Sequence, residues 1–229
     1  MKIHLCSDLH LEFGNTYFPS VEADTVIIAG DVAVKLKDIV VYLRKVAAVY
    51  ENVIYITGNH EYYGNDIAQM DYELYKEFEG TNVHFLQNEI LDLDGITFYG
   101  GTMWTDGANN RDNILEECIN DFRFIKDFSV KRMRKLHEEF KANIQDVDVI
   151  ISHHIPSDIF IPVKYRGSSI NGAFSCTDMG EFLPLPKVWC FGHTHDPIDI
   201  TIEKTRFLCN PYGYPHEYTD FDDELVFEV

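Results

Sequence analysis

Five short apolar runs, each cut off by polar residues, constrain the fold of this chain more than any other feature. In chain order the runs read KIHLCSD, TVIIAGD, NVIYITGN, DVIISHH and KVWCFGH. Runs of this length that are rich in Val and Ile are typical of strands buried on both faces of a sheet. The interior of a strand gives imidazole no packing role, so the two histidines just past VIIS predict chemistry at the strand ends.

Helical spacing between the second and third runs predicts how those strands are connected. Apolar residues recur every three or four positions through residues 36–50, as on the buried face of a helix. A strand, a helix and a second strand in this order form a β-α-β unit with parallel strands. A weaker helix is expected over residues 67–78, and another after Ser129, which can cap it.

Other segments predict antiparallel strands or loops. Asp94-Gly95 separates two alternating runs within residues 83–100, which is a hairpin signal. IDITIEKTRFLCN and ELVFEV, near the C-terminus, also read as antiparallel strands. The long segments Thr105 to Ile119 and Ser157 to Leu185 show little pattern, which indicates either functional loops or elements that the pattern does not reveal.

Composition narrows the class of protein. The 229 residues are enough for a single domain, residues 1–229, with a sizeable core. A formal net charge of -19 repels polyanions, so extended nucleic acid is a poor partner. The five cysteines form no Cys-x-x-Cys pair, which predicts buried, reduced thiols. With neither a signal peptide nor about 20 consecutive apolar residues, a cytoplasmic protein without a membrane segment is expected; the oligomeric state stays open.

The polar residues at the strand ends form one mixed set of donors. Carboxylates come from Asp8 and Asp31, and an amide comes from Asn59. The histidines of these loops are His10, His60, His153, His154, His193 and His195. Each motif alone fits an ordinary turn or surface pair. Because the carboxyl ends of parallel strands meet at one edge of a sheet, the five motifs together predict a single cleft.

This donor set predicts a metal site. Carboxylate, amide and imidazole without thiolate suit Mn, Fe, Zn, Co or Ni better than Mg or Ca, which prefer oxygen shells. Even seven of these nine donors are too many ligands for one tetrahedral zinc ion. Two divalent metal ions bridged by one carboxylate account for the number.

The order of these motifs resembles the signature of the calcineurin-like metallophosphoesterase superfamily. Its parts are Asp8-x-His10, Gly30-Asp31, Gly58 to Glu61, His153, and Gly192 to His195. The chain is most similar to small single-domain bacterial and phage-type members that carry GNHEYY, HHxPS and CNPxGYP, which are found here at residues 58–63, 153–157 and 209–215. The resemblance implies an α/β fold: a four-layer α-β-β-α sandwich of two mixed sheets.

The resemblance also implies roles for individual residues. One metal would be held by Asp8, His10, Asp31 and His195. The other would be held by Asp31, Asn59, His153 and His193. Manganese is the first expectation, with Fe, Zn, Ni or Co as alternatives. A hydroxide bridging the metals would attack a small phosphodiester or phosphomonoester, with His60 as general acid. Glu61 is expected to orient an imidazole, and His154 to face the substrate or donate a hydrogen bond behind the ligands.

Two other functions fit the same fold. A nuclease or DNA-repair phosphodiesterase of the superfamily is opposed by the absence of a basic stripe in the sequence. A non-catalytic scaffold is opposed by the complete set of ligand positions. Four softer candidates for substrate contacts have packing explanations that are at least as good: Trp104, Arg123, Asn171 and Tyr214.

Overall fold

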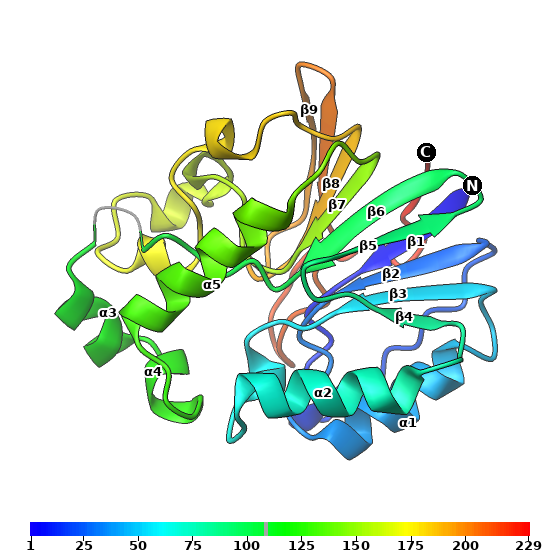
Figure 1. The fold of residues 1–229 in the computed structure, drawn as a ribbon, viewed down its shortest axis with the longest axis horizontal. Helices are drawn as coiled ribbons and strands as arrows, with labels where there is room; N and C mark the ends of the chain where they lie inside the picture. Colours follow the sequence, from blue (N-terminus) through cyan, green and yellow to red (C-terminus); the bar gives the residue numbers. More distant parts are fainter. Residues whose placement is uncertain (108–109) are drawn as a thin grey trace.

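The computed structural model describes residues 1–107 and 110–229, and two β-sheets form its centre (Figure 1). The first sheet has the strand order β11-β1-β2-β3-β4. Its members are β1 (Lys2–Cys6), β2 (Thr25–Ala29), β3 (Asn52–Ile56), β4 (Val83–Phe85) and β11 (Val226–Glu228). The first four run parallel, and β11 is antiparallel to β1. The first three apolar runs are therefore adjacent parallel strands, as predicted.

The second sheet has the strand order β5-β6-β7-β8-β10-β9. Its members are β5 (Glu89–Leu93), β6 (Ile96–Gly101), β7 (Val149–Ser152), β8 (Val188–Phe191), β9 (Ile198–Ile202) and β10 (Thr205–Cys209). Parallel pairing joins β6, β7, β8 and β10, and the outermost strands β5 and β9 are antiparallel to their neighbours. Asp94 and Gly95 both have positive φ, 53° and 82°, so the predicted hairpin is confirmed.

Helices cover the outer faces of both sheets, which makes four layers (Figure 1). Alternate residues of the strands serve different layers: Leu5 and Ile27 join the core between the sheets. Their neighbours Cys6 and Ile28 pack on the helical side. The helices are α1 (Leu36–Val46) and α2 (Ile67–Phe78) on the first sheet and α5 (Val130–Asn143) on the second. The predicted four-layer α/β fold is confirmed.

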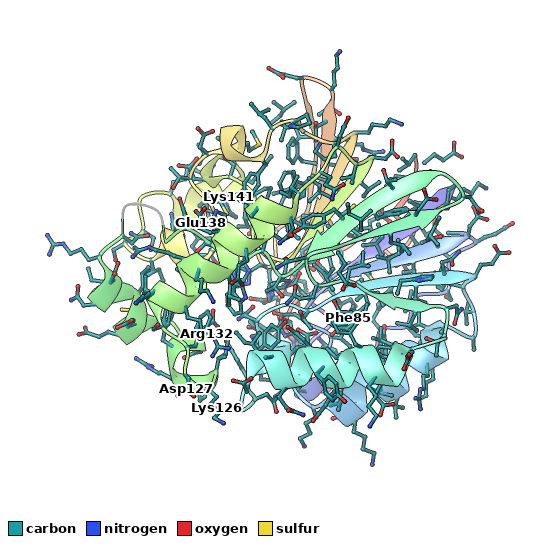
Figure 2. The ribbon with its side chains drawn as sticks, in the orientation of Figure 1. Phe85, Lys126, Asp127, Arg132, Glu138 and Lys141 are labelled. Atoms are coloured by element: carbon teal, nitrogen blue, oxygen red, sulfur yellow. The ribbon has the colours of Figure 1, made fainter. Side chains whose placement is uncertain are left out.

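The start of α5 is fixed by capping, as the sequence predicted. The Ser129 hydroxyl accepts a hydrogen bond from the Arg132 backbone N–H at 3.3 Å. The Arg132 guanidinium donates to the carbonyls of Lys126 and Asp127, which lie beside it in Figure 2. The helix therefore begins at a defined point, and its apolar side, which includes Phe140, packs on the second sheet.

The segments predicted to lack pattern contain short helices. The first, Thr105 to Ile119, holds α3 (Asp112–Cys118), so for those seven residues the alternative of an element that the pattern does not reveal is the correct one. Residues 108–109 of that loop lie outside the described residues. Only Leu115 of α3 is buried, so no apolar period could reveal the helix. The second segment holds the 3-10 turns η3 (Asp158–Phe160), η4 (Val163–Tyr165), η5 (Asn171–Ala173) and η6 (Met179–Phe182). Other short elements are α4 (Asp121–Phe124), which follows the first segment, and η1 (Leu11–Phe13) after β1.

Four of the five cysteines are buried: Cys6, Cys176, Cys190 and Cys209. Cys118 at the end of α3 is exposed, so the prediction of burial is wrong for this residue. The reason is that α3 is short and turns only Leu115 inward. Within residues 1–107 and 110–229, no helix has the length and apolar character needed to cross a membrane.

Candidate metal centre

Seven of the predicted site residues and His60 meet at the carboxyl ends of β1, β2, β3, β7 and β8. Their donor atoms form three groups, within each of which all atoms lie within 4.8 Å of one another. The groups are Asp8, His10 and His195; His10, Asp31 and His60; and Asp31, His153 and His193. The Asn59 Oδ1 atom joins the third group, 3.2 Å from His153 Nε2. The predicted convergence is therefore present, while the ligand roles stay a prediction.

The backbone at these strand ends is strained and tightly tied. Five of the candidate ligands have left-handed φ values between 46° and 69°: Asp8, His10, Asp31, His193 and His195. Such conformations cost roughly 1–3 kcal/mol each and persist where surrounding contacts enforce them. Here the Asp8 and His10 N–H groups each donate at 3.0 Å to carbonyls of the β2 loop. A side chain at Gly58 would collide with the Asp31 carboxylate.

Asp31 lies at the middle of the centre. Its Oδ1 atom accepts the His60 backbone N–H at 2.9 Å. Its Oδ2 atom is 3.3 Å from His153 Nε2 and 3.7 Å from His10 Nε2. Burial opposes the charged form, but the His153 and His60 charges hold the pKa of Asp31 well below its usual range. One oxygen is thus anchored to backbone, and the other faces two imidazole groups at once.

The first group brings two imidazoles edge to edge. His10 Nε2 and His195 Nε2 are 3.2 Å apart. Their Nδ1 atoms contact the carboxylates of Glu12 at 3.2 Å and Glu217 at 2.6 Å, so both Nδ1 atoms carry the hydrogen. With neutral rings, two lone pairs would face each other, which calls for a proton or a cation between them. Burial lowers the pKa of His195, but Asp8 and Glu217 raise it to about 9, so the site attracts positive charge.

The third group, with Asp31, His153 and the Asn59 oxygen, has the same property. His153 Nδ1 contacts the Ala29 carbonyl at 2.9 Å, and because a carbonyl can only accept, Nδ1 carries the hydrogen. His153 Nε2 then faces Asp31 Oδ2 at 3.3 Å and Asn59 Oδ1 at 3.2 Å. Burial lowers the pKa of His153, but Asp31 and other neighbours raise it to about 10. Three electron-rich atoms converge on a point that only a proton or a cation can occupy favourably.

Asp121 fixes the direction of the Asn59 amide. The Asn59 Nδ2 atom donates to Asp121 Oδ1 at 2.8 Å and to the Tyr63 hydroxyl at 3.1 Å. The Asn59 oxygen therefore points to His153 of the third group rather than away from it. Asp121 is buried, and burial raises its pKa. Sequence reasoning missed this residue because nothing in the local pattern around α4 marks it.

His193 belongs to the third group, and the His154 ring lies beside it. The His193 ring is stacked on Phe174 at 4.9 Å, and its pKa is held well below the usual range by burial. The His154 ring lies 4.5 Å from His193, and its Nδ1 donates to the Thr102 carbonyl at 3.2 Å. His154 is fully buried and outside the cavity lining, which contradicts the substrate-facing alternative. The strand alternation separates the pair, with ring planes of His153 and His154 at 88°.

Glu61 ties backbone loops together and contacts no imidazole among the described residues. Its carboxylate accepts the N–H groups of Asp31 at 3.1 Å, Val32 at 2.7 Å and Gly58 at 2.8 Å. Tyr55 also donates to it, at 3.0 Å. Burial and the Asp31 charge raise the pKa of Glu61 to about 7. The expectation that Glu61 orients an imidazole is therefore wrong; Glu12 and Glu217 do so instead. The contacts of Glu12 with His60 and of Glu217 with His195 join residues distant in sequence, which is why sequence reasoning missed them.

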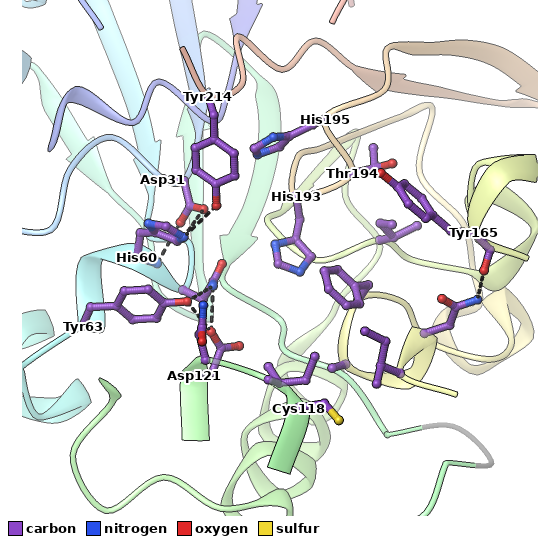
Figure 3. Close-up of a pocket in the computed structure, with 18 of the residues that line it drawn as sticks. Asp31, His60, Tyr63, Cys118, Asp121, Tyr165, His193, Thr194, His195 and Tyr214 are labelled. Atoms are coloured by element: carbon purple, nitrogen blue, oxygen red, sulfur yellow. Dashed lines mark hydrogen bonds and ion pairs between the residues drawn. The ribbon is translucent and has the colours of Figure 1, made fainter. Parts of the chain in front are cut away.

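His60 and Tyr214 stand at the open side of the centre. His60 begins the turn η2 (His60–Tyr62), and its Nδ1 contacts Glu12 Oε1 at 2.8 Å. Its Nε2 faces the centre, 4.0 Å from Asp31 Oδ2 and 3.3 Å from the Tyr214 hydroxyl. Figure 3 shows Tyr214 between His60 and His195. Of the four weaker candidates for substrate contacts, Tyr214 therefore lies at the site.

Of the other three weaker candidates for substrate contacts, one lines the cavity beside the centre and two do not. Asn171 lines a cavity of about 580 Å³ that opens beside the centre. Trp104 is buried, 5.0 Å from the His154 ring, and does not line that cavity. The Arg123 guanidinium donates to the Glu117 carbonyl. Packing and surface pairing therefore explain Trp104 and Arg123.

Comparison with known proteins agrees with this geometry. The chain belongs to the calcineurin-like phosphoesterase family, whose model matches residues 1–197. An uncharacterized protein of Acanthamoeba polyphaga mimivirus is 27% identical over 224 residues, covering 84% of this chain and 79% of that protein. A UPF0046 protein of Caenorhabditis elegans is 24% identical over 211 residues, which cover 86% of this chain and 64% of its relative.

A solved structure shows the same fold. The phosphopantetheinyl hydrolase (PptH) of Mycobacterium tuberculosis superposes with a TM-score of 0.76 at 19% identity. The match covers 95% of this chain and 93% of that one. At this identity the likeness extends to the fold, and the chemistry of this chain has to be argued from its own residues.

Proposed function

We propose that this protein is a dinuclear metal-dependent phosphoesterase that hydrolyses a small phosphodiester or phosphomonoester. The observation that carries the proposal is the sharing of Asp31 Oδ2 by two groups of donors whose lone pairs converge. A single carboxylate oxygen between two such groups suits a pair of divalent cations. Membership in the calcineurin-like phosphoesterase family supports the same reaction class.

The donor chemistry fits two divalent ions, with manganese as our first choice and Fe, Zn, Ni or Co as alternatives. The first set of ligands is Asp8, His10, Asp31 and His195, and the second is Asp31, Asn59, His153 and His193. When bound, the ions supply Lewis acidity, acidify a water to a hydroxide nucleophile, and offset the charge of the phosphate group. The protein holds the imidazoles in place through Glu12, Glu217 and the Ala29 carbonyl.

His60 is proposed to protonate the leaving alkoxide. Glu12 accepts from Nδ1 at 2.8 Å, which leaves Nε2 directed at the centre. General-acid assistance of this kind is typically worth about 10² to 10⁴ in rate. The complete ligand set supports catalysis over a scaffold role, and the net charge of -19 supports a small ester over extended nucleic acid.

The test is reconstitution of the purified chain with Mn²⁺, followed by metal analysis and assay. We expect close to two bound equivalents and hydrolysis of bis-p-nitrophenyl phosphate or p-nitrophenyl phosphate above a chelated control. His60→Ala should keep both metals and lose about 100-fold or more in kcat. His84→Ala is the matched control, because His84 lies on β4 and contacts Asn52 instead of the centre. Full metal loading with hydrolysis of neither ester would refute the proposal.

A further inference from the structure

The cavity beside the candidate metal centre has two walls of different chemistry. One wall carries ligand candidates, including Asp31, His193 and His195. The other wall is apolar and aromatic and is built from the α3–α4 region and the turns after β7. Its main members are Ile119, Phe124, Ile161, Tyr165, Ile170 and Phe174. Figure 3 shows Tyr165 across the cavity from His60. With a volume of about 580 Å³, the space holds far more than a phosphate group.

The apolar wall reaches the metal centre itself. Phe174 stacks on His193 with ring centroids 4.9 Å apart and an interplanar angle of 28°. On the other side Phe124 packs against Tyr63 at 5.4 Å, and Tyr63 packs against His60 at 4.4 Å. A phosphoester seated at the centre therefore places its alcohol part against aromatic surface at once.

No lysine or arginine lines the cavity among the described residues. Basic side chains close in sequence to the wall are engaged elsewhere, as the Arg123 guanidinium is with the Glu117 carbonyl. Lys164 pairs with Asp196 at 3.0 Å, and the Arg166 Nε donates to the Ile161 carbonyl at 3.3 Å. A second phosphate or carboxylate on the substrate would therefore be desolvated without a cationic partner, which is costly.

The acidic residues of the lining do not form a site for a cationic substrate. Glu12 is held by His10 and His60, and Glu217 is held by His195. Asp121 accepts from the Asn59 amide and the Tyr63 hydroxyl. The part of the ligand that extends from the centre into the cavity thus meets mainly carbon.

The mouth of the cavity is also apolar. Phe13, Phe124 and Tyr165 all belong to the lining and are 55%, 53% and 53% exposed. Exposed aromatic side chains that line one cavity mark a binding surface, because singly scattered ones are the norm elsewhere. A ligand that covers them gains apolar burial worth about 25 cal/mol per Å².

From these observations we propose that the cavity binds the alcohol part of the phosphoester substrate, and that this part is an uncharged aromatic or alkyl group without a second phosphate. This inference rests on the proposed phosphoesterase function and adds a substrate class to it. The ligand's single phosphate group is placed at the metal centre, and its carbon portion lies on the wall formed by Phe124, Tyr165 and Phe174.

The test is equilibrium binding by calorimetry to the Mn²⁺-loaded chain, with three non-hydrolysable probes. Methylphosphonate carries the charged group alone, phenylphosphonate adds an aromatic ring, and 4-carboxyphenylphosphonate adds a second anion to that ring. We expect phenylphosphonate to bind at least about tenfold more tightly than methylphosphonate, because the ring buries apolar surface. 4-Carboxyphenylphosphonate should bind at least about tenfold more weakly than phenylphosphonate, because its carboxylate has no cationic partner in the cavity.

Two variants and a control locate the effect. Tyr165→Ser and Phe124→Ser each remove a half-exposed wall side chain and should weaken phenylphosphonate binding about threefold or more, with methylphosphonate unchanged. Tyr72→Ser is the matched control, since Tyr72 is a 64% exposed aromatic residue on α2 that does not line the cavity. Tyr72→Ser should leave the affinities for phenylphosphonate and methylphosphonate unchanged.

The outcomes distinguish this inference from the proposed function. Equal binding of methylphosphonate and phenylphosphonate, or tighter binding of the carboxylated ring, would overturn the substrate class even if the chain hydrolyses model esters. A preference for the ring that Tyr165→Ser and Phe124→Ser both leave intact would overturn the assignment to this wall. A wall-dependent preference for the ring in a chain without hydrolytic activity would support the binding site and refute the proposed reaction.

Discussion

The strand-end loops and the apolar cavity wall are neighbours built on opposite principles. The loops hold five residues in left-handed backbone conformations, and backbone hydrogen bonds and the buried Glu61 carboxylate tie them together. The wall consists of α4 and short 3-10 turns of three or four residues, with half-exposed aromatic side chains. Donor positions in the loops are thus over-determined, whereas backbone hydrogen bonds of the wall mostly run within single turns, such as those from the Tyr165 and Phe174 N–H groups to the Pro162 and Asn171 carbonyls. A metal-dependent reaction requires accurately placed donor atoms, whereas binding of a carbon group requires only apolar surface.

The largest effect should come from the loops. Asp31→Asn keeps the size of the side chain and removes the negative charge that both donor groups face. We expect loss of one or both metals and a fall in turnover of about 10³-fold or more. Metal analysis and hydrolysis of bis-p-nitrophenyl phosphate check this, with the exposed Asp199→Asn as control. Wild-type metal content and rate in Asp31→Asn would show that the loops are not a metal centre.

Acid should loosen the strand that carries these loops. His4 of β1 is buried beside the Tyr50 hydroxyl, and burial lowers its pKa to about 4. In the unfolded chain His4 takes up a proton near pH 6.5, whereas in the folded chain it stays neutral down to about pH 4. The stability that the folded chain has with a neutral His4 is therefore complete above pH 6.5 and is lost as the pH falls toward 4. The loss amounts to about 3 kcal/mol at pH 4.

Urea unfolding of the metal-free chain at pH 7 and pH 4 measures this loss. His4→Gln is the comparison, because the carboxylates common to both chains contribute equally to the change. The free energy of unfolding should fall less in His4→Gln than in the parent. Equal falls would mean that the His4 imidazole is protonated without cost in the folded chain.

Asp121 tests the boundary between the two regions, because it lies on α4 of the wall and holds Asn59 of the loops. Asp121→Ala frees the Asn59 amide to rotate and should weaken binding of the second metal by about 10- to 100-fold. Tyr63→Phe removes only a hydroxyl from the same network and should cost less. Manganese titration resolves the two metals. An unchanged second affinity in Asp121→Ala would show that the wall and the loops act independently.

The smallest effect should come from the wall. Cys118 is exposed and lines the cavity, whereas the other four thiols are buried. Iodoacetamide should therefore add one group to the native chain, and Cys118→Ser should prevent it, with stability changed by less than about 0.5 kcal/mol. Intact-mass measurement checks the stoichiometry. Labelling of a second thiol under native conditions would mean that the core opens more readily than its burial implies.

The sequence predicted what local pattern encodes. Apolar runs followed by polar residues identified the strands, and short motifs at their ends identified the residues that converge. Partners distant along the chain could not be predicted in this way: Glu12 meets His60, and Glu217 meets His195, only because the fold brings separate loops together. Glu61 lies within a motif, yet its role was misjudged because its acceptor capacity is used by backbone N–H groups. Short turns in the wall carry no period at all.

Because the chain is synthesised from its N-terminus, the contacts that orient the candidate ligands do not all become available at the same time. Every candidate metal ligand lies within the first 195 residues, but the acceptor for His195 is Glu217, and the ring over His10 belongs to Tyr214. The Gly213 N–H also donates to the Asp8 carbonyl at 3.0 Å, so the last loop closes against the first. A nascent chain that has all its ligands but not this loop would hold His195 without an orienting partner. Metal uptake is therefore expected to follow synthesis of the loop that carries Tyr214 and Glu217.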